Sequence, residues 1–149
     1  MVKVFLVEDE AIIRHGIRDN IDWASHGFEF AGEAGDGEYA YPLILKAQPD
    51  ILVTDIKMPF MDGLELSRLV KKALPRTRII VLSGYNEFEY AKEAIKIGIS
   101  DYLLKPVSSA GLIDALKKAA DEIREEREKS KPLGRYFVSY EKNTEFLGK

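Results

Sequence analysis

The stretch VKVFLVEDEAII, residues 2–13, has the pattern of a buried strand that ends on a cluster of acids. The run up to Val7 is short and almost continuously apolar, as in a strand that is buried on both faces. Three acids follow at once, Glu8, Asp9 and Glu10, although neighbouring carboxylates repel one another. The reason for crowding carboxylates at this strand end depends on which residues end the other strands of the chain.

The composition is that of one globular domain with a short appendage. The chain has 149 residues, 46% of them hydrophobic and 32% charged, with a net charge of −3. A nucleic-acid surface is usually basic, so this balance does not favour one. The sequence contains no cysteine, which excludes thiolate metal sites and fits a reducing compartment. We see no signal peptide and no membrane span, and we expect a cytoplasmic protein.

Apolar runs alternate with longer amphipathic segments along the chain. The runs, at strand length, cover residues 2–7, 28–34, 50–55, 78–83 and 101–105. Five strands alternating with five helices predict an α/β fold with a parallel, doubly wound sheet. The right-handed crossover rule and the chain length favour a flavodoxin-like sheet with strand order 2-1-3-4-5.

Helical spacing and capping residues mark the segments between the runs. Asp36 and Asn86 are good caps for the second and fourth helices, and Gly98 closes the fourth. The expected buried faces are Ile12, Ile13, Ile17 and Ile21; Tyr39, Leu43 and Ala47; Leu66, Leu69, Val70 and Ala73; Phe88, Ala91, Ala94 and Ile95; and Leu112, Ile113, Leu116, Ala119, Ala120 and Ile123.

Polar residues end four of the five predicted strands. They are Glu8 and Asp9, Asp55, Ser83 and Lys105. The carboxyl ends of parallel strands share one edge, so these side chains are expected to converge. A divalent cation relieves the repulsion of three carboxylates, and an all-oxygen set suits Mg²⁺ or Mn²⁺ better than zinc or iron. Glu10 is more simply explained as a helix-start residue.

Asp55 emerges from the apolar run ILVT without a polar buffer. Alone, it would be interpreted as the start of a turn. Beside a metal pocket it is a candidate nucleophile that forms an acyl phosphate. Lys105 and the cation supply positive charge, and Ser83 can hydrogen-bond a phosphoryl oxygen. The bond between Lys105 and Pro106 is of the kind that can be cis, which could direct the ammonium inward.

Four motifs together resemble one family. FLVEDE, ILVTDIKMPFMDGLEL, VLSGY and SDYLLKPV, in this order and spacing, are similar to the receiver domain of two-component response regulators. The resemblance covers about residues 1–128, and residues 129–149 are expected to be a linker or truncated tail.

The resemblance implies a role for each matching residue. Asp55 would be the phosphoacceptor, with a sensor histidine kinase as donor. Asp9 would bind the metal directly, and Glu8, an Asp in most receivers, mainly through water. The Lys57 backbone carbonyl would be a further metal ligand. Lys105 and Ser83 would hold the phosphoryl group, while Ser83 and Tyr102 would act as switch residues; a packed edge aromatic remains a simpler interpretation of Tyr102. Such a domain would catalyse only its own phosphoryl transfer and autodephosphorylation.

Two further positions are expected to set the lifetime of the phosphoryl group. Lys57 lies two residues after Asp55, and Tyr85 lies two residues after Ser83. A long lysine and a bulky tyrosine there could shield the acyl phosphate from water. We therefore predict slow autodephosphorylation.

The stretch NIDWASHGFEFAGEAGDG, residues 20–37, resembles the YesN-like group, whose receivers precede AraC-type DNA-binding domains. Trp23 in this stretch can also simply cap the core. No such output domain lies within the chain, so we expect no direct DNA binding. The tail after Pro132 contains Tyr136, Phe137, Tyr140 and Phe146, too little to fold alone. Lys92, Lys96 and Asp101 could contribute to a dimer face on helix four, strand five and helix five.

Three other functions would use a similar set of site residues on the same fold. A phosphatase of the haloacid-dehalogenase kind needs a second acid two residues after the nucleophile, where this chain has Lys57. A nucleotide- or flavin-binding module needs a phosphate cradle after strand one, where the acids at 8–10 stand. A degenerate receiver acting without phosphorylation would not need the complete pocket.

Overall fold

The computed structural model describes residues 1–84 and 88–129, and this part of the chain forms a parallel sheet covered by helices. The strand order is β2-β1-β3-β4-β5, which confirms the predicted flavodoxin-like topology. The strands are β1 (Val2–Val7), β2 (Phe28–Ala34), β3 (Ile51–Asp55), β4 (Arg78–Ser83) and β5 (Asp101–Leu104). The helices are α1 (Ala11–Asn20), the short 3-10 helix η1 (Ala24–His26), α2 (Gly37–Ala47), α3 (Gly63–Ala73), α4 (Phe88–Ile97) and α5 (Ser109–Lys129).

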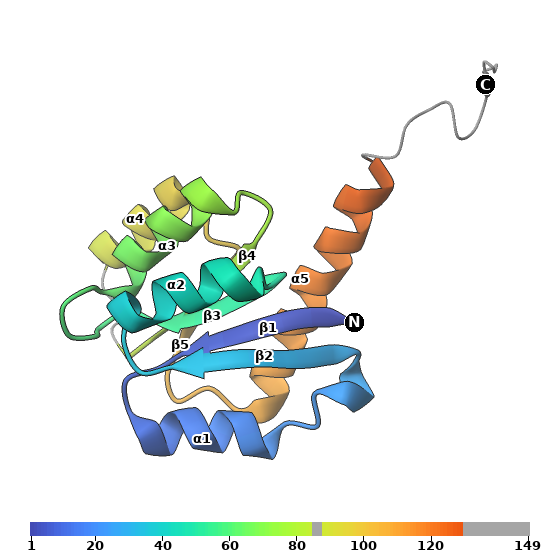
Figure 1. Ribbon diagram of the computed structural model, residues 1–149, viewed down its shortest axis with the longest axis horizontal. Helices are drawn as coiled ribbons and strands as arrows, with labels where there is room; N and C mark the ends of the chain where they lie inside the picture. Colours follow the sequence, from blue (N-terminus) through green and yellow to red (C-terminus); the bar gives the residue numbers. More distant parts are fainter. Residues whose placement is uncertain (85–87, 130–149) are drawn as a thin grey trace.

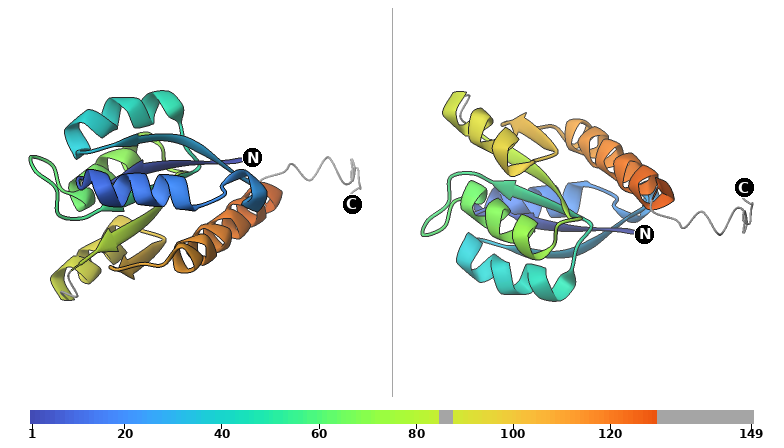
Figure 2. Two further views of the ribbon diagram at one scale, coloured as in Figure 1. Left: turned by 90° about the horizontal axis from the view of Figure 1, so that it is seen from below. Right: turned by 90° about the horizontal axis from the view of Figure 1, so that it is seen from above.

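Helices cover both faces of the sheet (Figure 1). The helices α1 and α5 lie on one face, and α2, α3 and α4 lie on the other, as the two turned views also show (Figure 2). The central strands therefore need apolar side chains pointing both ways. All five residues of β3 and the last five residues of β4 are buried. This double coverage explains why the strands appear as nearly continuous apolar runs in the sequence.

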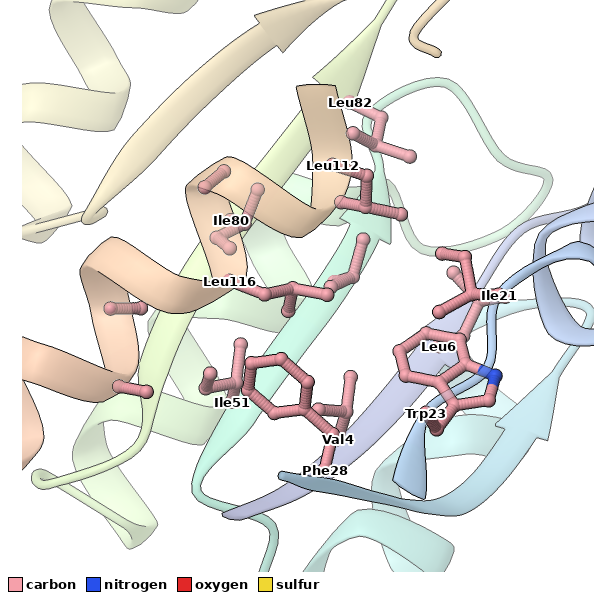
Figure 3. Packing of buried hydrophobic residues seen from close by; sticks show 14 of the residues in the cluster. Val4, Leu6, Ile21, Trp23, Phe28, Ile51, Ile80, Leu82, Leu112 and Leu116 are labelled. Carbon is pink, nitrogen blue, oxygen red and sulfur yellow. The ribbon is translucent and has the colours of Figure 1, made fainter. Parts of the chain in front are cut away.

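The core on the α1 and α5 face is shown in Figure 3. Trp23 closes one end of this core, and its indole N–H donates a hydrogen bond to the Arg18 carbonyl at 2.9 Å. The Trp23 and Phe30 ring centroids lie 5.0 Å apart. Trp23 therefore caps the core from the connection between α1 and β2, as one of the two interpretations of this residue predicted.

Four of the predicted buried positions on the helices are wrong. Ile12, Tyr39 and Ile95 are exposed by 89%, 63% and 79%. A helix turns by about 100° per residue, and the rotation of α1 leaves Ile13 half-buried while Ile12 points into solvent. In α2 the fully buried positions are Gly37, Ala40 and Ile44, while Leu43 and Ala47 are only partly buried. Ala73, at the end of α3, is also exposed.

Side-chain caps fix where two helices begin at the site edge. Asp36 accepts a hydrogen bond from the Tyr39 N–H at 2.7 Å, as predicted for the second helix. Asp62, which the sequence analysis did not single out, does the same for the Glu65 N–H at 2.8 Å. Tyr85, Asn86 and the tail residues Tyr136, Phe137, Tyr140 and Phe146 lie outside the described residues.

Candidate metal centre

The register of the sheet brings three carboxylates to one edge. Val7 pairs with Thr54 in the neighbouring strand, so Glu8, Asp9 and Asp55 follow at the same level. One carboxylate oxygen of each lies within 4.8 Å of the others. Glu8 is fully buried, Asp55 is 5% exposed and Asp9 is exposed. The convergence expected from the strand ends is therefore present in the fold.

Lys105 connects the two buried acids. Its Nζ lies 2.8 Å from Glu8 Oε1 and 3.1 Å from Asp55 Oδ2. Its backbone N–H donates to the Ser83 carbonyl at 2.8 Å, which ties the end of β5 to the end of β4. The peptide bond between Lys105 and Pro106 is cis. The contacts of Nζ with Glu8 and Asp55 show that the ammonium points at the carboxylates.

Burial and ion pairing shift the pKa values of the charged groups in this cluster in opposite directions. Burial, together with the charge of Asp55, raises the pKa of Glu8 to about 7, although the nearby Lys105 ammonium acts to lower it. Burial also raises the pKa of Asp55. The pKa of Lys105 is raised as well, because its two acidic neighbours outweigh the effect of burial. Two desolvated carboxylates share one ammonium, so the cluster is short of positive charge.

The loop after β3 holds Asp55 by backbone contacts. Asp55 Oδ1 accepts a hydrogen bond from the Ile56 N–H at 2.9 Å, and the Gly63 N–H donates to the Ile56 carbonyl at 2.7 Å. A Cβ on Gly63 would lie 1.9 Å from the Asp55 carbonyl oxygen. Only glycine permits the start of α3 to approach this closely. Within this loop the Met61 N–H donates to the Pro59 carbonyl at 2.8 Å.

Ser83 and Tyr102 lie on the same face of the sheet. Ser83 is fully buried at the end of β4, two residues after Val81, which pairs with Tyr102. Side chains two apart along a strand share a face, and Tyr102 packs with the core on the α4 side. The two residues are therefore neighbours beneath α4.

The Lys57 side chain lies against α4. Its Nζ lies 5.3 Å from the centroid of the Tyr90 ring on α4, within cation–π distance. Tyr85, the other position expected to control the phosphoryl lifetime, lies outside the described residues. A lysine ammonium has no lone pair to give to a metal, so the backbone carbonyl is the part of Lys57 that could bind one.

The donor set fits a hard divalent cation. All three candidate ligands offer carboxylate oxygen, which Mg²⁺ and Mn²⁺ accept. Glu8 Oε1 is in ion-pair contact with Lys105, yet within residues 1–84 and 88–129 it has no partner of acceptable hydrogen-bond geometry. Buried polar atoms are normally satisfied. A cation, or water bound to it, would complete this site.

Arg14 also contacts the site, although its sequence context did not predict this. Its Nη1 donates to the Glu8 carbonyl at 2.6 Å, and its Nε donates to Glu33 Oε1 at 2.9 Å. An arginine one helical turn after an acidic strand end was the available signal. Its acceptor is a backbone carbonyl, which every residue has, so the sequence pattern could not identify it.

A family model described as the response regulator receiver domain matches residues 4–117. The chain belongs to this family. The family assignment made from the four motifs is confirmed. Among the described residues of this receiver, we find no helix with the length and apolar character that a membrane span requires.

Relatives and solved structures place the receiver more narrowly. The chain is 46% identical over 124 residues to the uncharacterized transcriptional regulatory protein YesN of Bacillus subtilis, covering 83% of this chain and 34% of YesN. It is 42% identical over 112 residues to the transcriptional regulatory protein HptR of Staphylococcus aureus, covering 75% of this chain and 44% of HptR. The chain thus spans less than half of each relative.

The solved structures that match this fold agree with the sequence relatives. The REC domain of the response regulator AraT from Geobacillus stearothermophilus has a TM-score of 0.78 and 44% identity, covering 85% of this chain and 99% of that one. A two-component transcriptional regulator AraC from Clostridium phytofermentans has a TM-score of 0.75 and 32% identity, covering 87% of this chain and all of that one. The assignment to the YesN-like group is confirmed.

Proposed function

We propose that this receiver is a phosphorylation-dependent signalling switch. It accepts a phosphoryl group from a sensor histidine kinase onto Asp55 and thereby regulates an attached or partner output, which we take to be transcription. One observation carries the proposal: Asp55 lies at a strand end with two further acids within 4.8 Å and the Lys105 ammonium at 3.1 Å. The cytoplasmic location and the receiver boundary at residue 128 remain part of the proposal.

The proposed reaction requires positioning and charge neutralisation. A carboxylate oxygen of Asp55 forms a bond to phosphorus, and the bond from phosphorus to the donor nitrogen breaks; that nitrogen keeps the electron pair and takes up a proton. Mg²⁺ or Mn²⁺, when bound, neutralises phosphoryl oxygens. Asp9 and Asp55 would hold it directly, Glu8 mainly through water, and Lys57 through its backbone carbonyl. Lys105 would hold a phosphoryl oxygen.

The proposed switch lies next to this site. A new phosphoryl oxygen attracts the Ser83 hydroxyl, and Tyr102 fills the space that Ser83 leaves. The two residues are neighbours on the face covered by α4, so their movement repacks α4, β5 and α5. Ile95 and Leu104 on this surface are exposed apolar residues, which supports its use for homodimerisation after phosphorylation. DNA would be bound only through an output domain outside this chain.

The direct test is phosphorylation by a small acyl phosphate in the presence of Mg²⁺, followed by intact-mass measurement. We expect a gain of one phosphoryl group that disappears in Asp55→Asn and in excess chelator. Asp62→Asn is the matched control, because it alters an exposed acid in the same loop and asparagine also caps helices well. No gain with any donor, including a kinase, would refute the proposal.

Each of the other candidate functions predicts a different experimental result. Turnover of a generic phosphomonoester would support a phosphatase, and a yellow preparation would support a flavin-binding module. The Lys57 side chain occupies the position where a phosphatase of this kind needs an acid and extends toward Tyr90. This arrangement favours a receiver that catalyses only its own phosphoryl transfer and autodephosphorylation.

A further inference from the structure

The acidic turn after β1 is held through Glu8, whose N–H donates to the Ala34 carbonyl at 3.1 Å and whose own carbonyl accepts from the Arg14 side chain. Arg14, in the second turn of α1, donates from Nη1 to the Glu8 carbonyl at 2.6 Å. The same guanidinium donates from Nε to Glu33 on β2 at 2.9 Å. Its side chain is only 16% exposed. Arg14 therefore connects the residue that begins the acidic turn to the neighbouring strand.

The other end of this connection is firmly held. Glu33 accepts from Arg14 and also from Arg18 Nη1 at 2.7 Å. Partial burial acts to raise the pKa of Glu33, but the two arginines outweigh it and lower the pKa, so Glu33 is ionised at neutral pH. A Cβ on Gly35 would lie 3.2 Å from Arg14 Nη1, so the guanidinium also lies against the backbone there. These contacts hold the Arg14 side chain in one conformation.

We infer that Arg14 is a positioning residue for the metal centre, which it serves by fixing the backbone from which the Glu8 and Asp9 carboxylates project. This inference rests on the proposed cation binding by these acids. Mg²⁺ demands near-ideal octahedral geometry, so a small rotation of the turn moves ligand oxygens out of range. Residues that orient metal ligands typically change metal affinity by about 10- to 100-fold when removed.

Charge and positioning predict opposite results for the loss of Arg14. If the guanidinium acted only through its charge, removing it would strengthen binding of a cation to nearby acids. If it acts by holding the turn, removing it weakens binding despite the lost repulsion. The sign of the change in Mg²⁺ affinity therefore separates the two explanations.

Arg18 offers a matched control on the same helix. It carries the same charge and donates to the same Glu33 carboxylate, but the other acceptor of its guanidinium is Asp19 rather than the acidic turn. Arg18→Met therefore removes a cation and a bond to Glu33 while leaving the bond from Arg14 to Glu8 in place. An effect confined to Arg14 identifies that bond as the cause.

The test is calorimetric titration of the 149-residue chain with Mg²⁺, with the melting temperature of the metal-free protein measured in parallel. We expect Arg14→Met to weaken Mg²⁺ binding on the order of tenfold. Arg18→Met should bind within about twofold of wild type or slightly more tightly. Arg14→Lys should be intermediate, since it keeps the charge but loses the planar fork of donors.

The possible results are distinguishable. Arg14→Met that binds Mg²⁺ as tightly as wild type, or more tightly, overturns the inference, as does an equal loss in Arg18→Met. If Arg14→Met does not fold, Arg14→Lys decides, and wild-type affinity in that variant overturns the inference. Wild-type protein that binds no Mg²⁺ overturns both the inference and the proposed metal centre. Wild-type binding with an unaffected Arg14 variant overturns the inference alone.

Discussion

The Lys105 ammonium lies 3.1 Å from Asp55 Oδ2, so the candidate phosphoacceptor already has a cationic partner. The same nitrogen lies 2.8 Å from Glu8 Oε1. One lysine therefore serves two buried carboxylates in the metal-free protein. A bound divalent cation and this ammonium would share the same negative charges, which makes Lys105 both a counterion of the resting site and a competitor of the metal.

Replacing Lys105 by Met should lower stability and raise metal affinity. The loss leaves Glu8 and Asp55 buried without their counterion, which we expect to cost at most about 3 kcal/mol, because either acid can take up a proton instead. Mg²⁺ should bind more tightly, since no ammonium competes. Chemical denaturation in chelator and calorimetry with Mg²⁺ measure the two effects. Lys118→Met, at an exposed position on α5, is the control, and weaker Mg²⁺ binding by Lys105→Met would contradict the prediction.

Metal-free stability should depend on the ionisation of Glu8. Its pKa is about 7 in the folded protein and 4.5 without the fold, so folding takes up a proton between these values. A raised carboxyl pKa therefore gives stability at low pH that is lost as the pH rises toward 7. Glu8→Gln should raise the melting temperature at pH 8 in chelator and give a smaller gain at pH 5. Calorimetric scans at both values check this, and a gain that grows as the pH falls would refute it.

Gly63 should tolerate no side chain. A Cβ there would lie 1.9 Å from the Asp55 carbonyl oxygen, so Gly63→Ala must displace either β3 or α3. We expect a loss of several kcal/mol in the free energy of unfolding, as for other forced overpacking of a core. Gly16→Ala is the matched control in the interior of α1. The nearest atom to its Cβ would be 3.9 Å away, and alanine there should stabilise by about 0.5–1 kcal/mol.

The phosphoryl group on Asp55 should be long-lived, and Lys57 and Tyr85 should both prolong its life. We expect slow loss of the phosphoryl mass after the donor is removed, and faster loss in Lys57→Ala and in Tyr85→Ala. Tyr90→Ala tests whether the contact of Lys57 with α4 contributes, since the Lys57 ammonium lies 5.3 Å from that ring. A wild-type half-life of seconds, unchanged by these substitutions, would count against the prediction.

The amino-acid sequence by itself determined the architecture and the membership of the acidic cluster. Strand runs and helical spacing are local patterns, and parallel strands place their carboxyl ends at one edge whatever their exact register. Glu8, Asp9, Asp55 and Lys105 could therefore be expected to converge before any contact was known. The exposed positions of Ile12 and Tyr39 were not predictable to one residue, because apolar residues occur on both sides of the true helix faces.

Only the tertiary structure decided how the site is held. Lys105 reaches Glu8 and Asp55 because β5 lies beside β4 and its end is tied to Ser83. Arg14 reaches a backbone carbonyl, and the Lys57 ammonium lies over the Tyr90 ring on α4. These contacts join segments far apart in the chain and depend on register, helix rotation and backbone atoms. Side-chain patterns encode none of these directly. The sequence therefore predicted which residues gather at the site, and the fold determined which of their atoms make hydrogen bonds and ion pairs.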